Sequence, residues 1–234
     1  GSDRPNATAT LVLDGVPDAV HVGVYVATAR GYDEAEGVTL RVRAARSVAD
    51  PARSLERGDA QLAVLDLHDL AIERAKGRDL VAVMSIAQLP ERARARRTLR
   101  AHGRARLAAR IDFARAPAYP ELVLATTSTT LTEQRPVVRA AVRAIVRGYG
   151  AELDDPDTAL QALLRHVPAS RRRAVSARLP DVEEAFTGTT GKVGAFDRRR
   201  LRAWARWEAR QGIVRRAPDV AAMVRPIAAP SSSY

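Results

Sequence analysis

The stretch "HVGVYVATARGYDEAEGVTLRV", residues 21–42, predicts a helix, a tight glycine turn and a strand in direct succession. Apolar residues recur at helical spacing over residues 19–30, and Gly31 offers a helix end. The alternation in "VTLRVR", residues 38–43, is typical of a half-exposed strand. An apolar, β-branched run at residues 8–13 precedes the helix and predicts a short buried strand. Together these segments form a strand–helix–strand unit.

Strands and helices continue to alternate beyond this unit. Residues 60–66 and 79–86 predict two more buried strands with a helix between them, and residues 121–127 predict a fifth strand. Strands that alternate with helices at this spacing indicate a mostly parallel sheet flanked by helices. Almost all of residues 135–212 is predicted to be helical. The sequence therefore predicts the α/β class with a helical C-terminal half.

Composition excludes several classes of protein. The 234 residues are 46% hydrophobic, which is too apolar for a disordered chain, and no run approaches the roughly 18 apolar residues of a membrane span. Cysteine is absent, so disulfides, cysteine nucleophiles and thiolate metal sites are excluded. The net charge of +11 comes almost entirely from arginine, and aromatic residues make up only 4%. Because single-strand binders use aromatic stacking platforms, we expect no nucleic-acid partner.

Residues 91–115 differ from the rest of the chain. They are rich in arginine, and their apolar stripe is thin, consisting of Leu99, Leu107 and Ile111. A charge run of this kind usually forms a solvated face, so the segment is interpreted as a solvated helix or a loose connector. A patch for an anionic partner is the alternative. The segment has too few bulky apolar residues to form a packed second domain.

Polar side chains gather where the predicted strands end. In open parallel sheets ligands bind at the carboxyl ends of the strands, so one pocket is expected there. The candidates that end strands or open the following helices are Asp14, His21, Asp66, His68, Asp69 and Gln88. Each also has a structural interpretation: Asp14 and Asp66 as turn caps, and His68 as a surface residue. Asp69 is interpreted as a first-turn acid that complements the helix dipole.

The same residues give little support for metal binding or catalysis. Two histidines with aspartates are a plausible ligand list, but their spacing matches no metal motif. No glycine-rich phosphate loop follows the first strand, and no G-x-S-x-G elbow is present. His102 and His166 lie in arginine-rich stretches without an evident nucleophile. We therefore expect no metal, no cofactor and no enzyme.

Several segments, in order, carry a family likeness. "TLVLDGVPDAVHVGVYVATARGYDEAEGVTLRV", residues 10–42, resembles the opening of solute-binding proteins of ABC importers in the thiamine-pyrimidine-precursor, alkanesulfonate and taurine group. The elements that match are a strand, "H-x-G-x-Y-x-A", "G-Y", an acidic residue, "E-G" and a second strand. The likeness continues through residues 55–90, 116–131, 138–149, 154–160 and 193–214.

This resemblance implies a fold and a task. The family has two α/β lobes, and its ligand is clamped between strand ends of both. The resemblance implies that His21 and Tyr25 line the cleft close to Asp14. The ligand-binding residues it implies are Asp14, His21, Tyr25, Asp66, His68 and Gln88. The resemblance also implies a small polar ligand, such as a thiamine pyrimidine precursor, and an ABC permease as partner. It implies an extracytoplasmic localisation, either in the periplasm or as a membrane-anchored lipoprotein. A signal segment is not expected within this chain.

The chain departs from the family after residue 90. Relatives spend about a hundred residues, the size of a small domain, on the second lobe, where this chain has only residues 91–115. We therefore expect a flexible lead-in at 1–7, one discontinuous α/β lobe at 8–90 and 116–228, an arginine-rich connector at 91–115 in place of the second lobe, and a tail at 229–234. The alternatives are an interaction module that dimerises through the exposed cleft face, and an enzyme like the eukaryotic pyrimidine synthases. Those synthases carry a cysteine-rich motif that this chain lacks.

Overall fold

The sheet has five strands in a single layer. The computed structural model describes residues 6–227, so the predicted tail and most of the predicted lead-in lie outside the described residues. The spatial order is β2-β1-β3-β5-β4, and the prediction of one sheet is confirmed. The strands are β1 (Ala7–Val12), β2 (Val38–Arg43), β3 (Leu62–Asp66), β4 (Leu80–Ala87) and β5 (Leu122–Thr127).

Four of the five strands point the same way. β1 pairs in parallel with β2 and β3, whereas β5 lies between β3 and β4 and is antiparallel to both. The sheet is therefore mostly parallel, as predicted. The reversal of β5 has one consequence for the site. Because Asp66 at the end of β3 pairs with Leu122 at the start of β5, the residue before β5, Glu121, lies at the same edge as the carboxyl ends of the other strands.

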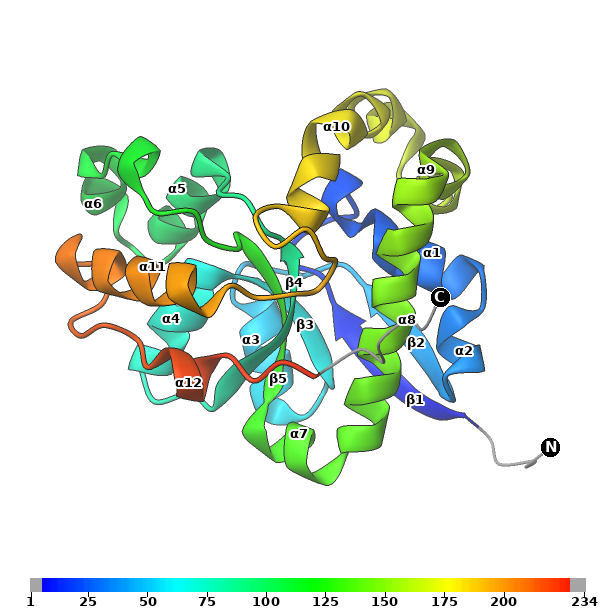
Figure 1. The fold of residues 1–234 in the computed structure, drawn as a ribbon, viewed down its shortest axis with the longest axis horizontal. Helices are drawn as coiled ribbons and strands as arrows, with labels where there is room; N and C mark the ends of the chain where they lie inside the picture. Colours follow the sequence, from blue (N-terminus) through cyan, green and yellow to red (C-terminus); the bar gives the residue numbers. More distant parts are fainter. Residues whose placement is uncertain (1–5, 228–234) are drawn as a thin grey trace.

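Helices cover both faces of the sheet and build two apolar cores (Figure 1). One core lies among α1, α8, α9 and α10, and the other among α3, α4, α5, α11 and α12. The helices are η1 (Ala19–His21), α1 (Val22–Ala29), α2 (Tyr32–Ala35), α3 (Asp50–Arg57), α4 (Leu67–Ala75), α5 (Arg92–Ala101), α6 (Ala105–Arg110), η2 (Phe113–Arg115), α7 (Ser128–Glu133), α8 (Arg135–Asp154), α9 (Pro156–Leu164), α10 (Ala169–Thr187), α11 (Arg198–Arg210) and α12 (Val220–Met223). The predicted helical C-terminal half is confirmed.

The two glycines of the first core allow α1 and α8 to touch. Gly148 of α8 lies against the backbone of Gly23 in α1, and a Cβ on Gly148 would stand 1.9 Å from the Gly23 carbonyl oxygen. Next to it, the Tyr149 hydroxyl donates to the carbonyl oxygen of Val20, at 2.6 Å. This close contact fixes α1, and therefore the η1 turn before it, against the long helix α8.

Residues 91–115 pack against the second apolar core. They form α5, α6 and η2, and on the apolar side Ala95, Leu99 and Ile111 are buried in the second core. The segment is helical, as one of its two interpretations has it, and its apolar side is buried in the second core. Alanine supplies part of the buried stripe, and counting only bulky apolar residues underestimates such a stripe. Most arginines of this segment are exposed, whereas Arg94 is buried and Arg96 and Arg104 are half-buried.

The outer edge of β4 is covered by segments from the C-terminal half. The amide of Ser85 donates to Gly194, and the amides of Arg225 and Ile227 donate to the carbonyls of Ala82 and Val83. An uncovered edge strand would offer its backbone groups to another chain, and these contacts remove that opportunity. Across residues 6–227 no helix combines the length and the apolar content needed to cross a bilayer.

Glu152 of α8 gives a prediction about stability and pH. It is fully buried, and neither of its carboxyl oxygens has a hydrogen-bond partner. Burial, and then the Glu183 carboxylate, raise its pKa to about 7. The native state thus favours the protonated form, and stability should fall as pH rises from the usual glutamate range through 7. Glu152→Gln should raise the free energy of unfolding by about 1–3 kcal/mol at pH 8 and little at pH 5. Urea melts at both pH values measure this, and an equal effect at both would contradict it.

Candidate binding site

The histidine at the mouth of the first helix has a fixed orientation. Asp18 caps the η1 turn, and its backbone amide donates to Nδ1 of His21 at 3.0 Å. Because Nδ1 accepts, the proton of the imidazole is on Nε2, which donates to Asp14 Oδ1 at 2.7 Å. His21 is 2% exposed, so this contact is shielded from water. The turn therefore holds an imidazole against the carboxylate that follows β1.

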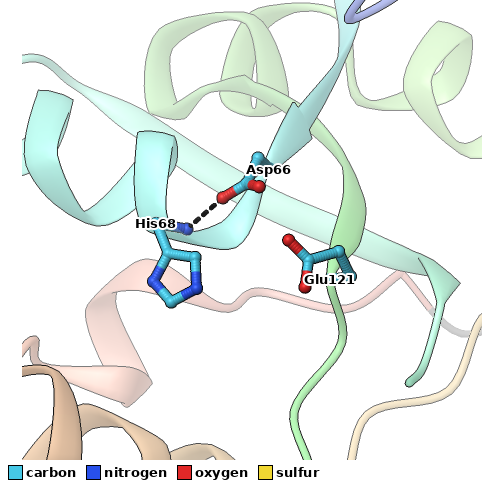
Figure 2. A group of neighbouring side chains, drawn as sticks. All are labelled: Asp66, His68 and Glu121. Carbon is cyan, nitrogen blue, oxygen red and sulfur yellow. Dashed lines mark hydrogen bonds between the residues drawn. The ribbon is translucent and has the colours of Figure 1, made fainter. Parts of the chain in front are cut away.

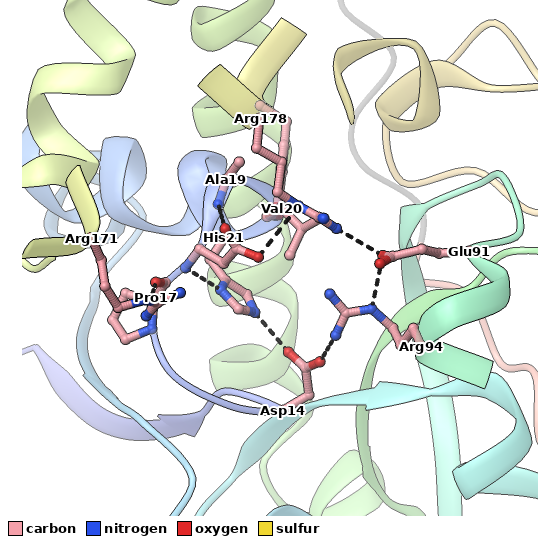
Figure 3. A network of polar contacts seen from close by, with 11 residues as sticks. Asp14, Pro17, Ala19, Val20, His21, Glu91, Arg94, Arg171 and Arg178 are labelled. Atoms are coloured by element: carbon pink, nitrogen blue, oxygen red, sulfur yellow. Dashed lines mark hydrogen bonds and ion pairs between the residues drawn. The ribbon is translucent and has the colours of Figure 1, made fainter. Parts of the chain in front are cut away.

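Charged side chains from three elements meet at Asp14 (Figure 3). Arg94 of α5 contacts the second oxygen of Asp14, and its Nε donates to Glu91 at 3.2 Å. Arg178 of α10 pairs with Glu91 at 2.9 Å. Burial raises the pKa of Asp14, but the hydrogen bond from His21 and the charge of Arg94 outweigh it and lower the pKa to about 2. Asp14 is therefore ionised, and it links the end of β1 to α5.

A cavity of about 120 Å³ opens beside this pair. Its polar lining consists of the carboxylates of Asp14, Asp66 and Asp69, the guanidinium groups of Arg94 and Arg97, and the Thr98 hydroxyl. Asp69 also accepts from His102 Nε2 at 2.6 Å. The cavity thus combines three carboxylates with two guanidinium groups.

Two carboxylates at the sheet edge each keep an unused oxygen (Figure 2). Asp66 caps α4 by accepting from the amide of His68 at 2.7 Å through Oδ1, while its buried Oδ2 has no hydrogen-bond partner. Glu121 accepts from the Glu91 amide and the Tyr119 hydroxyl through Oε2, and its buried Oε1 has no hydrogen-bond partner. Burial, and then the nearby Asp66, raise the pKa of Glu121 well above its usual range.

His68 lies behind these carboxylates and is fully buried. Its Nδ1 is 2.8 Å from Glu208 Oε2, and its Nε2 is 2.8 Å from the Tyr119 hydroxyl. The ring also packs beside Trp204, with centroids 5.9 Å apart. Burial lowers the pKa of His68, but Glu208 and the other carboxylates outweigh it and raise the pKa to about 10. The imidazole is therefore a buried cation that ties α4 to α11, and not a surface residue.

Two of the predicted ligand residues lie elsewhere. Tyr25 stacks on His166, with ring centroids 4.5 Å apart, and burial raises its pKa to about 12. Gln88 donates to the carbonyls of Phe186 and Lys192 at 3.1 and 2.7 Å and accepts from Thr190, so it holds the loop after α10. Neither lines the cavity beside Asp14, and His21 and His68 are not part of its lining either, so Asp14 and Asp66 are the predicted residues that line it. The expectation of a single concavity for all the predicted residues is therefore corrected.

The structure brings Asp14, His21 and Asp66 together and adds two residues that the sequence did not indicate. Arg94 is 8% exposed although it belongs to the arginine-rich segment, and no local pattern separates it from its solvated neighbours. Glu121 reaches the edge because β5 is reversed. Glu121 stands directly before a predicted strand, which is the one signal in the sequence. A parallel β5 would place Glu121 at the opposite edge of the sheet, so the sequence alone does not indicate it as a site residue. Ligand binding by the six residues stays a prediction.

The edge of the sheet is also less open than expected for a dimerising face. Within residues 6–227 the large hydrophobics that stay exposed are Val16, Val48 and Leu153, while α5 and α10 cover the network around Asp14. The broad apolar surface that motivated self-association is not present in this part of the chain. Dimerisation itself stays a prediction.

Solved structures share this architecture. A Candida albicans protein described as having the generic periplasmic binding protein fold superposes with a TM-score of 0.67 and 10% identity, covering 93% of this chain and 96% of its own. The alkanesulfonate-binding protein SsuA from Xanthomonas axonopodis pv. citri, solved with MOPS, superposes with a TM-score of 0.60 and 13% identity, covering 96% of this chain and 100% of its own. The chain thus shares the α/β fold of proteins with the periplasmic binding protein fold.

Sequence comparison identifies the family. The profile described as NMT1/THI5 like matches residues 18–98 and 93–159, which is more than half of the chain. The chain belongs to the NMT1/THI5-like family. Over 88 residues it is 31% identical to the formylaminopyrimidine-binding protein of Halalkalibacterium halodurans. That match covers 38% of this chain and spans 27% of the relative's length.

Proposed function

We propose that this chain binds a small polar molecule at the carboxyl edge of its sheet and delivers it, outside the cytoplasm, to the permease of an ABC importer. The observation that carries the proposal is the acceptor-rich cavity beside Asp14 and Arg94. Family membership supports it, because the curated relative is named as a binding protein. This role needs neither a cofactor nor a catalytic step.

The charges of the cavity favour ligands with N–H donors over anions. Three carboxylates line it, and the guanidinium of Arg94 is already paired with Asp14 and Glu91. An anion such as nitrate or a sulfonate would face three carboxylates against the guanidinium of Arg97 and the already paired Arg94, which costs binding free energy. An amino group can instead donate to Asp14 or to the unused oxygen of Asp66. Charge-assisted hydrogen bonds of this kind are the stronger ones in proteins.

The size of the cavity and its mixed lining of carboxylates and guanidinium groups favour an aminopyrimidine. A volume of about 120 Å³ is below the 300–1,000 Å³ typical of sites for drug-sized ligands, so a single ring suits it better than a larger molecule. A pyrimidine ring nitrogen accepts hydrogen bonds and can face the Arg94 guanidinium while its amino group faces a carboxylate. This agrees with the ligand in the name of the curated relative, formylaminopyrimidine.

The segment 91–115 takes the place of a second lobe in this proposal. The lobe then consists of residues 8–90 and 116–228, and α5 supplies the wall opposite the sheet edge. Arg94 and Glu91 of this wall contact Asp14 and Arg178 across the edge. A wall of one helix contributes fewer ligand contacts than a whole lobe, so we expect weaker binding than a two-lobed protein achieves.

A thermal-shift screen tests the proposed ligand class. At about 100 times its Kd, a bound ligand stabilises the native state by about 2.7 kcal/mol, which corresponds to a rise in Tm of about 5–10 °C for a chain of this size. We expect this rise with formylaminopyrimidine and not with nitrate, taurine or an alkanesulfonate. Asp14→Asn should remove it, whereas Asp112→Asn, which removes the same charge at an exposed position, should not. A rise with the anions alone would contradict the proposal.

A further inference from the structure

Three donor side chains converge behind the cavity. Asp66 comes from the end of β3, His68 from the first turn of α4, and Glu121 from the residue before β5. One donor atom of each lies within 4.8 Å of the other two, and all three residues are buried. Figure 2 shows the two carboxylates and the imidazole turned toward the same space.

The carboxylates in this group are incompletely satisfied. Asp66 Oδ2 and Glu121 Oε1 have no hydrogen-bond partner, and the two residues are only 4% and 1% exposed. Buried polar atoms without partners are rare in folded proteins because each has given up its hydration without compensation. Two such oxygens lie in one cluster, and the surrounding protein supplies no donor to either of them.

We propose that Asp66, His68 and Glu121 bind a divalent transition-metal ion of the zinc class. Imidazole nitrogen and carboxylate oxygen are both zinc ligands, and a set with one imidazole disfavours Mg²⁺ and Ca²⁺, which prefer oxygen alone. The proposal differs from the expectation drawn from spacing, because Glu121 lies 53 positions beyond His68 and joins the group only through the reversed strand.

The surroundings of His68 match those of a metal-binding histidine. Such histidines usually donate from the second ring nitrogen to a carboxylate, which fixes the orientation of the ring. Here Nδ1 of His68 faces Glu208 at 2.8 and 2.9 Å. The other nitrogen, Nε2, faces the Tyr119 hydroxyl, which also donates to Glu121. The ion takes the place of the proton on Nε2, while Tyr119 continues to donate to Glu121.

Binding requires a modest contraction of the group. Zinc–ligand bonds of about 2.0 Å in a tetrahedron place the ligand atoms about 3.3 Å apart, compared with the limit of 4.8 Å seen here. Three protein ligands leave the fourth position open. Because Asp66 also lines the cavity, an ion held by this group would lie beside the cavity.

A second group, Asp69, Glu73 and His102, has similar spacing but different surroundings. Glu73 is paired with Lys76 at 2.8 Å and with Arg78, and His102 already binds Asp69 at 2.6 Å. These cations supply the positive charge that an ion would bring. The second group is therefore the matched control.

Zinc titration by calorimetry, in buffer cleared of metals and without any organic ligand, tests the site. We expect one Zn²⁺ per chain, with Glu121→Gln weakening binding by more than about 100-fold and His102→Gln leaving it unchanged. Co²⁺ gives a second readout by quenching tryptophan fluorescence, because both tryptophans of the chain, Trp204 and Trp207, lie about 6 Å from the His68 ring. Quenching should follow the same pattern in the variants.

The controls keep the test decisive. Circular dichroism establishes that each variant is folded, and Asp66→Asn replaces Glu121→Gln if that variant is not. Folded wild-type protein that binds no zinc would overturn the site. Zinc binding that is unchanged in Glu121→Gln, or zinc binding that is lost in His102→Gln, would also overturn the site. Because no organic ligand is present, the result does not depend on the proposed solute-binding function.

Discussion

Replacing Gly148 with alanine is expected to lower the free energy of unfolding by about 3 kcal/mol, the upper end of the range for overpacked interiors. The new Cβ would stand 1.9 Å from the carbonyl oxygen of Gly23 and about 3 Å from the backbone nitrogen of Ala27. Both atoms belong to the backbone of α1, so no side chain can rotate to make room. The helices must separate, which also disturbs the contact between Tyr149 and Val20.

The matched control is Gly150→Ala in the same helix. Nothing lies within 4 Å of a Cβ at Gly150, so alanine there brings only its better helix propensity. That substitution should stabilise the protein by about 0.5–1 kcal/mol. Urea denaturation of both variants measures the difference. Equal stability of the two would show that α1 and α8 are not in close contact.

Glu208→Gln is expected to lower the free energy of unfolding by about 3 kcal/mol, because it breaks a buried ion pair on one side. Glu208 and His68 are both fully buried, and their side chains lie 2.8 Å apart. The neutral amide leaves the imidazolium without its nearest countercharge, in a place where water cannot reach it. Glu121 and Asp66 compensate only in part, since they face the other side of the ring.

The same substitution at an exposed position, Glu133→Gln at the end of α7, serves as the control and should change stability by less than about 0.5 kcal/mol. Both variants are melted in urea with EDTA present, so that bound metal does not contribute. A Glu208→Gln protein as stable as the wild type would show that His68 is neutral in the native state.

Local patterns predicted most of the fold. The β-branched runs gave the five strands within one or two residues, and helical spacing with glycine ends gave the main helices. These signals depend on residues close in sequence, which is why they can be read without a structure. The direction of β5 could not be read in this way. Its run of apolar residues looks the same for a parallel and an antiparallel central strand, because both are buried on both faces.

The candidate site was predicted less completely, for a related reason. Asp14 and Asp66 were found because they follow strands, and His21 because it opens the next helix. Gln88 also ends a strand, but its side chain is taken up by carbonyls about a hundred positions later in the chain. Arg94 is buried only because Asp14 lies opposite it. The tertiary structure determines such pairings, and the spacing of residues in the sequence does not predict them.

The chain is proposed to bind an amino-bearing ring at Asp14, and a calorimetric titration with formylaminopyrimidine is the sharpest test of this binding. A charge-assisted hydrogen bond contributes about 1.5–3 kcal/mol, which corresponds to a factor of about 10–150 in Kd. We expect one site per chain and a Kd that rises by at least about tenfold in Asp14→Asn. The proposal would be contradicted if an alkanesulfonate gave heat of binding and the pyrimidine did not. An unchanged Kd for the pyrimidine in Asp14→Asn would also contradict it.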